Sequence, residues 1–297
     1  MSNQNPAKDD SSPSQTYIIG DSILELPKMQ SETFRLVVTS PPYWNAKNYG
    51  EEQIGFGQSY SQYVSSLNSV WKECIRLLMP NGKIAVDIQP LPISTAQTGI
   101  GRSSIADIMN DVVDFMQDNG MHISNLFIWD KRKYNNQRIF GSYPYPPNLY
   151  SHVAFELIYV FRKPGNPPKV SPELKEKSKI SLKDWEQWCF NSIWDIPPVI
   201  KISSKGELVG HLAPFPVEIP RRLIRLFTFV GDKVLDPFLG SGTTLAACKL
   251  ENRIGVGVEI QKKFEPMIKA FLERPRSPPS IKLAKERRTE AELTFWT

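Results

Sequence analysis

Apolar positions along this chain alternate between short runs and longer stretches in which they recur every three or four residues. Residues 60–79 show the second pattern most clearly and end at Pro80-Asn81-Gly82, a turn sequence, so they predict an amphipathic helix. Residues 83–88 follow directly as a largely apolar run, which predicts a buried strand.

The same alternation continues through most of the chain. Predicted strands cover residues 17–21, 36–39, 83–88, 123–129, 156–161, 233–236 and 253–259. Predicted helices cover residues 60–79, 104–119, 217–229 and 243–249, with a polar loop expected over residues 89–103. Strands that alternate with helices favour an α/β fold, in which a mostly parallel sheet carries helices on both faces.

Three stretches interrupt this pattern. Residues 1–14 are polar and predict a disordered tail. Residues 163–205 are rich in Pro, Lys and Trp without a clear period, and they predict an insertion. Residues 274–297 begin with a basic stretch and predict a solvated tail or helix. The remaining chain divides into two halves, residues 15–162 and 206–273.

Composition narrows the class of protein. The chain has 297 residues, of which 40% are hydrophobic, enough to bury a substantial core. No apolar stretch approaches the roughly 18 residues of a membrane span, and the polar start lacks a signal-peptide core, so we expect a cytoplasmic protein without a membrane partner. The cysteines are odd in number and far apart, which predicts neither disulfides nor a metal site. They are Cys74, Cys189 and Cys248.

The first candidate chemical motif is Thr-Ser-Pro-Pro-Tyr-Trp at residues 39–44. It follows a predicted strand, and open α/β sheets keep their ligand crevice at the carboxyl ends of strands. Taken alone, Ser-Pro-Pro-Tyr is more often a surface turn, because Pro pairs punctuate loops.

The second motif is Asp-Pro-Phe-Leu-Gly-Ser-Gly-Thr-Thr at residues 236–244. It follows another strand and opens the helix at residues 243–249, a geometry that lets the backbone approach a nucleotide-like cofactor. A glycine turn alone could equally serve tight packing of a helix on a strand. Both motifs together, each after a strand, predict a catalytic site beside a cofactor site.

Together the two motifs resemble those of the DNA amino-methyltransferases that use S-adenosylmethionine. Further matches are Gly20-Asp21, the segment from Leu78 to Gly82, and His-Leu-Ala-Pro-Phe-Pro at residues 211–216, so the resemblance covers residues 17–271. The catalytic motif precedes the cofactor motif, as in the beta class of this restriction-modification family. The resemblance implies a Rossmann-like methyltransferase fold with a permuted motif order. Met-Pro-Asn-Gly stands where Pro-Gly-Gly is commoner, which affects only a turn.

The residues of the second motif suit S-adenosylmethionine. Gly240 and Gly242 leave room for its methionine part, and the free amides at the helix start near Thr243 suit its carboxylate. Glu259 ends the next strand, where an acid accepts hydrogen bonds from ribose hydroxyls, although it could also be a solvated strand end.

The resemblance assigns further cofactor contacts. It implies that Asp21 holds the adenine amino group, that Asp236 lies close to the methionyl amino group, and that Phe238 packs against the adenine. Three residues of the 211–216 segment are expected to close the pocket: His211, Ala213 and Phe215. His211 could alternatively be a structural histidine.

The Ser-Pro-Pro-Tyr motif suits methylation of an exocyclic amino group, whose lone pair is delocalised into the base ring. The Ser40 hydroxyl and the Pro41 carbonyl can accept both N–H bonds and so localise that lone pair, while Pro41 and Pro42 stiffen the loop. Tyr43 is expected to stack on a base rotated out of the duplex. By resemblance to some cytosine enzymes, Asp87 is a candidate third polar group near the amino nitrogen.

The base itself is predicted from one position. Ser rather than Asp at the start of the catalytic motif is typical of the members that methylate cytosine N4, and adenine N6 remains the alternative. Methylation of pyrimidine carbon 5 is excluded because the enzymes that perform it carry a Pro-Cys nucleophile, whereas Glu73, Trp188 and Ala247 precede the cysteines here.

Charge distribution suggests the DNA contacts better than the modest net charge of +5. Residues 131–150 are basic and aromatic without an acid, which suits phosphates and unstacked bases, although a solvated loop is the other interpretation. Candidate DNA contacts there are Lys131, Arg132, Lys133, Arg138 and Tyr143. With residues 163–205 they are expected to recognise the target sequence.

The expected partner is therefore double-stranded DNA, with a cognate restriction endonuclease by analogy alone. We expect a monomer or weak dimer. A catalytically silent nucleic-acid-binding subunit on the same fold is the alternative of a different class.

Overall fold

A computed structural model of the chain describes residues 13–45, 53–93, 104–134, 140–141, 145, 149–150, 153–199 and 215–273. Its centre is an eight-stranded sheet in the order β1-β12-β11-β2-β3-β9-β6-β10. These strands are β1 (Thr16–Ile19), β2 (Phe34–Thr39), β3 (Leu78–Ile88), β6 (His122–Asp130), β9 (Phe155–Arg162), β10 (Ile193–Asp195), β11 (Lys233–Asp236) and β12 (Ile254–Glu259). Two short strand pairs lie apart from it, namely β4 (Leu91–Ile93) with β5 (Ser104–Ala106), and β7 (Phe140–Gly141) with β8 (Leu149–Tyr150).

The sheet is mostly parallel, as predicted. Strand β9 runs antiparallel to its neighbours β3 and β6, whereas the other neighbouring strands of this sheet pair in parallel. The carboxyl ends of the parallel strands therefore meet at one edge, and β9 begins at that same edge.

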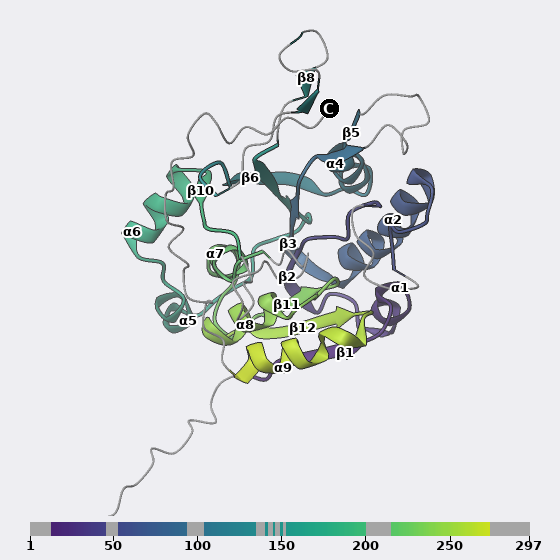
Figure 1. The fold of residues 1–297 in the computed structure, drawn as a ribbon. Helices are drawn as coiled ribbons and strands as arrows, with labels where there is room; N and C mark the ends of the chain where they lie inside the picture. Colours follow the sequence, from purple (N-terminus) through teal and green to yellow (C-terminus); the bar gives the residue numbers. More distant parts are fainter. Residues whose placement is uncertain are drawn as a thin grey trace, which may run out of the picture.

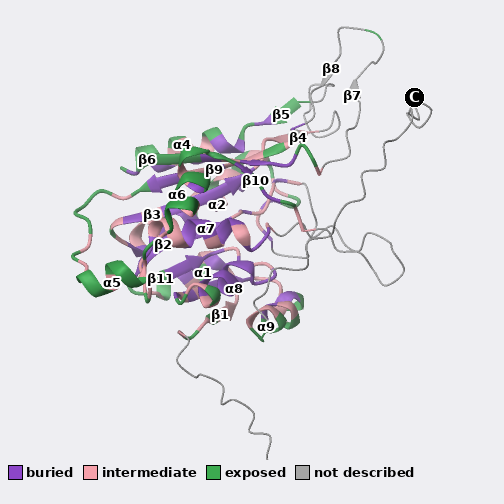
Figure 2. Cartoon of the chain, turned by 90° about the vertical axis from the view of Figure 1, so that its left-hand side faces the viewer, coloured by how far each residue is buried: buried purple, intermediate pink, exposed green. Residues whose placement is uncertain are grey.

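Helices cover both faces of the sheet (Figure 1). One face carries α1 (Ser22–Glu25), α2 (Tyr60–Leu77) and α4 (Ile108–Asp118), and the other carries α7 (Glu218–Phe227), α8 (Thr243–Leu250) and α9 (Glu265–Glu273). Side chains of β2 alternate between the two cores: Val37 packs on the α2 side, and Leu36 and Val38 pack on the α7 side. Figure 2 shows the buried sheet between these layers. None of the described helices is long and apolar enough to cross a membrane.

Helix α2 begins where the sequence predicts, because Ser59 and Gln62 form a reciprocal capping box. The helix ends at Leu77, since β3 begins at Leu78 and runs through the expected turn at residues 80–82. Asn81 adopts a positive φ of 60°, and the register between β2 and β3 shifts near this point. The turn residues therefore make an irregularity within one strand rather than a connection between a helix and a strand.

The helix expected over residues 104–119 begins later, at Ile108. Its N-cap is Asp107, whose carboxylate accepts a hydrogen bond of 3.2 Å from the amide of Asn110. Residues 104–106 instead form β5, which pairs with β4 in the expected polar loop.

The expected insertion contributes to the main sheet. It contains α5 (Pro172–Lys177), α6 (Leu182–Trp185), a π-helical turn over Glu186–Phe190, and β10, which extends the sheet beside β6. Trp188 anchors this segment to α7, because the guanidinium of Arg222 lies 5.5 Å from its ring centre and that of Arg225 lies 5.2 Å away. The expected tails lie largely outside the described residues, as do residues 200–205.

Candidate active site

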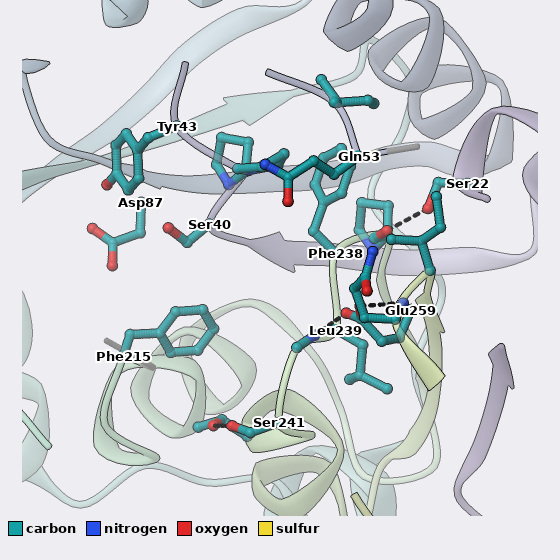
Figure 3. A pocket seen from close by; sticks show the side chains of 18 of the residues that line it. Ser22, Ser40, Tyr43, Gln53, Asp87, Phe215, Phe238, Leu239, Ser241 and Glu259 are labelled. Atoms are coloured by element: carbon teal, nitrogen blue, oxygen red, sulfur yellow. Dashed lines mark hydrogen bonds between the residues drawn. The ribbon is translucent and has the colours of Figure 1, made fainter. Parts of the chain in front are cut away.

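A cavity of about 380 Å³ opens at the edge where the parallel strands end. Its wall is built from the ends of β2, β3, β6, β11 and β12 and from the start of β9. Figure 3 shows two groups of side chains around it: Ser40, Tyr43 and Asp87 gather on one side, and Phe238 and Glu259 on the other. We call these the Ser40 end and the Glu259 end.

All five residues predicted for catalysis line the Ser40 end: Ser40, Pro41, Pro42, Tyr43 and Asp87. The loop is held from α2, where the Tyr63 hydroxyl donates a hydrogen bond of 2.9 Å to the Pro42 carbonyl. The next residue, Trp44, is 8% exposed and donates its indole N–H to the Gln58 carbonyl, so it packs behind the loop. Tyr43 is thus the aromatic side chain of this motif that faces the cavity.

Asp87 is the most isolated polar group of the site. It is 3% exposed, and neither of its carboxylate oxygens has a hydrogen-bond partner. Burial is the main cause that raises the pKa of Asp87, and the carboxylate of Glu156 raises it further. The ammonium of Lys131 lowers this pKa. An unpartnered buried carboxyl beside Ser40 is costly for the fold and available to a ligand.

The Tyr43 hydroxyl is held from two sides. It donates a hydrogen bond of 3.1 Å to Glu156 Oε2 and accepts one of 3.0 Å from the backbone amide of Gln89. Burial raises the pKa of Tyr43 well above its ordinary value, and the carboxylates of Glu156 and Asp87 raise it further. The phenol therefore stays protonated at neutral pH and keeps its donor role.

An ion pair completes this wall. Lys131 Nζ lies 2.5 Å from Glu156 Oε1 and 3.0 Å from Gln89 Oε1, and it also lies 5.1 Å from the centre of the Trp129 ring. Both charged side chains are nearly buried, at 11% and 12% exposure. Desolvation makes such a pair sensitive to the removal of either partner.

Lys131, one of the predicted DNA contacts, lies in the cavity wall, where it pairs with Glu156. Its contact with DNA stays a prediction. Its neighbours Arg132 and Lys133 are exposed, and they pair with Asp130 and Asp195. The other two predicted DNA contacts, Arg138 and Tyr143, lie outside the described residues.

At the Glu259 end, a carboxylate joins two chain segments. Glu259 Oε2 accepts a hydrogen bond of 2.7 Å from the Gly240 amide, and Oε1 accepts one of 2.8 Å from the Gln261 amide. Burial raises the pKa of Glu259, and these two amides lower it. Each oxygen retains a lone pair, so the carboxylate can still accept hydrogen bonds from a ligand in the cavity.

The two glycines of the turn have different surroundings. Gly240 has a φ of +55°, and a Cβ built on it would meet no atom within 4 Å, so its open side faces free space at the cavity. Gly242 has a φ of +95°, and its Cβ would lie 3.1 Å from the Cα of Ile268 in α9. Gly242 does not line the cavity, so its space serves the packing of α9 rather than a ligand, which differs from the expectation.

Asp236 also lies behind the cavity rather than in its wall. It is 1% exposed, and three donors surround its carboxylate: the Thr39 hydroxyl at 2.7 Å, the Thr244 hydroxyl at 2.5 Å and the Phe238 amide at 3.0 Å. Burial raises its pKa from 3.8 to about 6 despite these donors. In this structure Asp236 shapes the turn that follows β11.

Four other predicted cofactor residues line the cavity: Asp21, Phe215, Phe238 and Thr243. Asp21 caps α1 through a hydrogen bond of 2.9 Å from the Ile23 amide, and the neighbouring Ser22 hydroxyl donates to the Pro237 carbonyl. Phe238 lies edge-on to Trp71 at 5.9 Å. His211 and Ala213 lie outside the described residues.

Sequence reasoning missed Glu156 and Gln89. Glu156 lies near the start of β9, and the start of a strand reaches this edge of the sheet only because β9 is antiparallel. The available signal was an acid beside an apolar run, which also fits an ordinary solvated strand end. Gln89 follows β3 directly and is the first residue of the expected polar loop.

The Glu259 end fits a nucleoside-like cofactor with a charged tail. It offers a carboxylate acceptor, the face of Phe238 and an unfilled space at Gly240. Among the described residues, no group of three or more His, Cys, Asp or Glu side chains is placed to hold a metal ion.

Comparison with known proteins identifies relatives. A family model described as DNA methylase (N6_N4_Mtase) matches residues 34–270. The Type II methyltransferase M.MjaI of Methanocaldococcus jannaschii is 31% identical over 277 residues, which cover 84% of this chain and 88% of that protein. The Type II beta methyltransferase M.BslI of a Bacillus species is 32% identical over 258 residues, which cover 83% of this chain but 26% of that longer protein. TTHA0409 of Thermus thermophilus, solved in complex with S-adenosyl-L-methionine, matches with a TM-score of 0.71 and 31% identity over 89% of this chain and 96% of that one.

Proposed function

Because the chain belongs to the DNA methylase family whose model spans residues 34–270, we propose that it transfers a methyl group from S-adenosylmethionine to cytosine N4 in duplex DNA. The sequence-based assignment to the beta-class DNA amino-methyltransferases is confirmed by this family match and by the two Type II relatives. S-adenosylmethionine is the cofactor, as in the structure of TTHA0409. The choice of base and the roles of individual residues are the proposal.

The observation that carries the proposal is that the two motifs share one cavity. Ser40 and Pro41 line it at one end, and Gly240 and Glu259 line it at the other. A methyl donor bound at the Glu259 end and an amino group bound at the Ser40 end can therefore meet inside a partly enclosed space. Neither site alone would account for group transfer.

Residues of the Ser40 end act on the amino group. The Ser40 hydroxyl and the Pro41 carbonyl accept its two N–H bonds, which localises the nitrogen lone pair as the methyl group approaches. Tyr43, fixed by Glu156 and Gln89, stacks on the base after the base leaves the duplex. Asp87 lies beside them with a free carboxyl group that can meet a polar atom of the base ring.

Residues of the Glu259 end hold the cofactor, which supplies an electrophilic methyl group on a sulfonium centre. Glu259 accepts from the ribose hydroxyls, Phe238 packs against the adenine, and Asp21 binds the adenine amino group. The open side of Gly240 leaves room for the methionine part. Asp236 holds the turn in shape through Thr39 and Thr244.

Cytosine is favoured over adenine by Ser40. Family members that methylate cytosine N4 usually have a serine, with its neutral hydroxyl, at the first position of the motif. Members that methylate adenine N6 usually have an aspartate there. Adenine N6 is the second candidate, supported by the family model, which includes both activities in its designation.

The surroundings of the cavity support contact with DNA. Arg132 and Lys133 are exposed next to the lining residue Lys131, where they can approach phosphates if they give up their ion pairs. We propose that residues 131–150, together with the segment 163–205, recognise the target sequence. By analogy with restriction-modification systems, we also propose a cytoplasmic enzyme that acts as a monomer or weak dimer alongside a cognate endonuclease.

The experiment that tests the proposal is transfer of a labelled methyl group from S-adenosylmethionine to duplex DNA, followed by digestion to nucleosides. The expected product is N4-methyldeoxycytidine. Label recovered in N6-methyldeoxyadenosine would show that adenine, and not cytosine, is the target base. Cofactor and DNA binding without transfer would support a catalytically silent subunit instead.

A further inference from the structure

The wall behind Tyr43 and Asp87 contains charged groups that the proposed chemistry has not used. Lys131 and Glu156 form an ion pair of 2.5 Å there, and both line the cavity. Two opposite charges at 11% and 12% exposure have given up most of their hydration, which an ordinary surface ion pair does not require. We therefore looked for a role of this ion pair in the site itself.

Glu156 contacts the residue expected to stack on the base. Its Oε2 accepts the Tyr43 hydroxyl at 3.1 Å, while its Oε1 is occupied by Lys131. The Gln89 amide donates to the same Tyr43 hydroxyl at 3.0 Å, and the Gln89 side chain accepts from Lys131 at 3.0 Å. These contacts close a ring that fixes the end of the Tyr43 side chain.

The same pair lines the cavity together with Asp87. The charged or titratable groups that act on the Asp87 carboxyl come from different elements: Glu156 from β9 and Lys131 from the end of β6. Tyr43, from the loop after β2, also senses the Asp87 charge. Because Asp87 makes no hydrogen bond of its own, its proton responds mainly to burial and to these neighbours.

We propose that Glu156 and Lys131 are positioning residues of the methyl transfer: Glu156 anchors the Tyr43 ring at the base-binding place, and the two opposite charges act on the Asp87 carboxyl in the same cavity wall. The inference rests on the proposed function. It assigns no contact with substrate to either residue.

The proposal is tested most directly by removing the negative charge of Glu156 in one variant and the positive charge of Lys131 in another. Glu156→Gln removes a negative charge but keeps an oxygen for the Tyr43 hydroxyl, so it should lower the pKa of Asp87. Lys131→Met removes the positive charge and should raise it. In single-turnover methylation measured from pH 5 to pH 10, the limb governed by Asp87 should therefore move by about one pH unit to lower pH in the first variant and to higher pH in the second.

The limb moves in the same direction whether protonated or ionised Asp87 is the active form, because its midpoint is the pKa of Asp87 in either case. Lys269→Met is the matched control, since Lys269 forms an exposed ion pair of 2.9 Å with Glu265 on α9, away from the cavity wall. Its profile should stay at the parent position. Asp87→Asn should remove the shifting limb and so identify it.

The anchoring role has its own measurement. Glu156→Ala leaves the Tyr43 hydroxyl without its acceptor, so its single-turnover rate should fall about tenfold below that of Glu156→Gln. A fluorescent base analogue at the target position should report less extrusion in Glu156→Ala, while cofactor affinity stays at the parent value.

The outcomes separate this inference from the function on which it rests. A parent protein that transfers no methyl group to DNA would refute the proposed function. A parent that transfers normally, with the Glu156→Gln profile unshifted or shifted to higher pH, would overturn the inference alone. The nearly isosteric Glu156→Gln decides the sign even if Lys131→Met does not fold.

Discussion

The Thr39 hydroxyl donates a hydrogen bond of 2.7 Å to the carboxylate of Asp236. Thr39 ends β2 immediately before Ser40, and Asp236 ends β11 immediately before the turn that carries Gly240. One buried hydrogen bond therefore ties the strand that carries the proposed catalytic loop to the strand that carries the proposed cofactor turn. This bond adds to the backbone pairing of the two strands next to the cavity.

This bond should matter most when Asp236 is ionised. Burial raises the pKa of Asp236 from 3.8 to about 6, so the folded protein keeps a proton there that the unfolded chain releases. The contribution of Asp236 to the free energy of unfolding should therefore fall as pH rises from about 4 to about 6. Thr39→Val should lower the free energy of unfolding by roughly 1.5–3 kcal/mol at about pH 8 and by less at about pH 4.5.

Urea unfolding at the two pH values measures this difference. Thr33→Val is the control, because the Thr33 hydroxyl donates to a backbone carbonyl on the surface and not to a buried acid. Equal losses for Thr39→Val at both pH values would show that Asp236 is not the titrating partner.

Substitutions of the two glycines of the turn should affect different properties: stability for Gly242 and cofactor binding for Gly240. Gly242→Ala places a Cβ 3.1 Å from the Ile268 backbone at a φ of +95°, so we expect a loss of about 1–3 kcal/mol in the free energy of unfolding. A Cβ on Gly240 would meet no protein atom within 4 Å, so Gly240→Val should fill ligand space, and its φ of +55° adds about 1–3 kcal/mol of backbone strain. Calorimetric titration with S-adenosylmethionine should show no binding for Gly240→Val, with circular dichroism to check that the variant is folded. Binding at parental affinity would place the cofactor elsewhere.

Glu259 should affect the cofactor more than the fold. Glu259→Gln keeps one carbonyl oxygen for the Gly240 amide but loses the second acceptor, which receives the Gln261 amide and which we propose also receives a ribose hydroxyl. We expect S-adenosylmethionine affinity to fall about tenfold, in line with the loss of one hydrogen bond to a charged group. An unchanged dissociation constant would exclude Glu259 from the ribose site.

Two substitutions of Tyr43 separate stacking from anchoring. Tyr43→Phe keeps the ring but loses the bonds to Glu156 and Gln89, whereas Tyr43→Ala loses the ring as well. Stacking contributes roughly 1–3 kcal/mol per base, so Tyr43→Ala should extrude a fluorescent target analogue less than Tyr43→Phe does. A mismatched target costs less to open and should recover part of the loss. Parental extrusion in Tyr43→Ala would assign stacking to another aromatic side chain.

Much of this site could be predicted because parallel strands bring their ends together. Ser40, Asp87 and Glu259 each follow or end a predicted strand, and the structure collects them around one cavity. The sequence could not predict Glu156, because its place at this edge depends on the antiparallel direction of β9 in the main sheet. The sequence also could not distinguish Lys131 from Arg132 and Lys133. All three are adjacent cations, and only the fold shows that Lys131 pairs with a nearly buried carboxylate.

Short elements were the other source of difference. Strand β10 has three residues, too few for a periodic pattern, and its position beside β6 depends on Trp194 packing against Phe127 at 4.4 Å between ring centres. Similarly, Gly242 and Asp236 stand within the motif that predicts cofactor binding, yet their side-chain space and carboxylate are used by neighbouring protein atoms. A motif locates a turn but does not say which of its residues face the ligand.

We propose that Ser40 acts on the target amino group as the methyl group moves, in the cavity that the cofactor shares. The most direct measurement is single-turnover methylation of duplex DNA by the parent and by Ser40→Ala, together with cofactor and DNA affinities for both. We expect N4-methyldeoxycytidine from the parent and a rate at least roughly 100-fold lower in Ser40→Ala, which is the effect of removing one hydrogen-bonding group from a transition state. The cofactor and DNA affinities should stay within about threefold of the parental values. A Ser40→Ala variant that methylates at the parental rate would contradict this proposal.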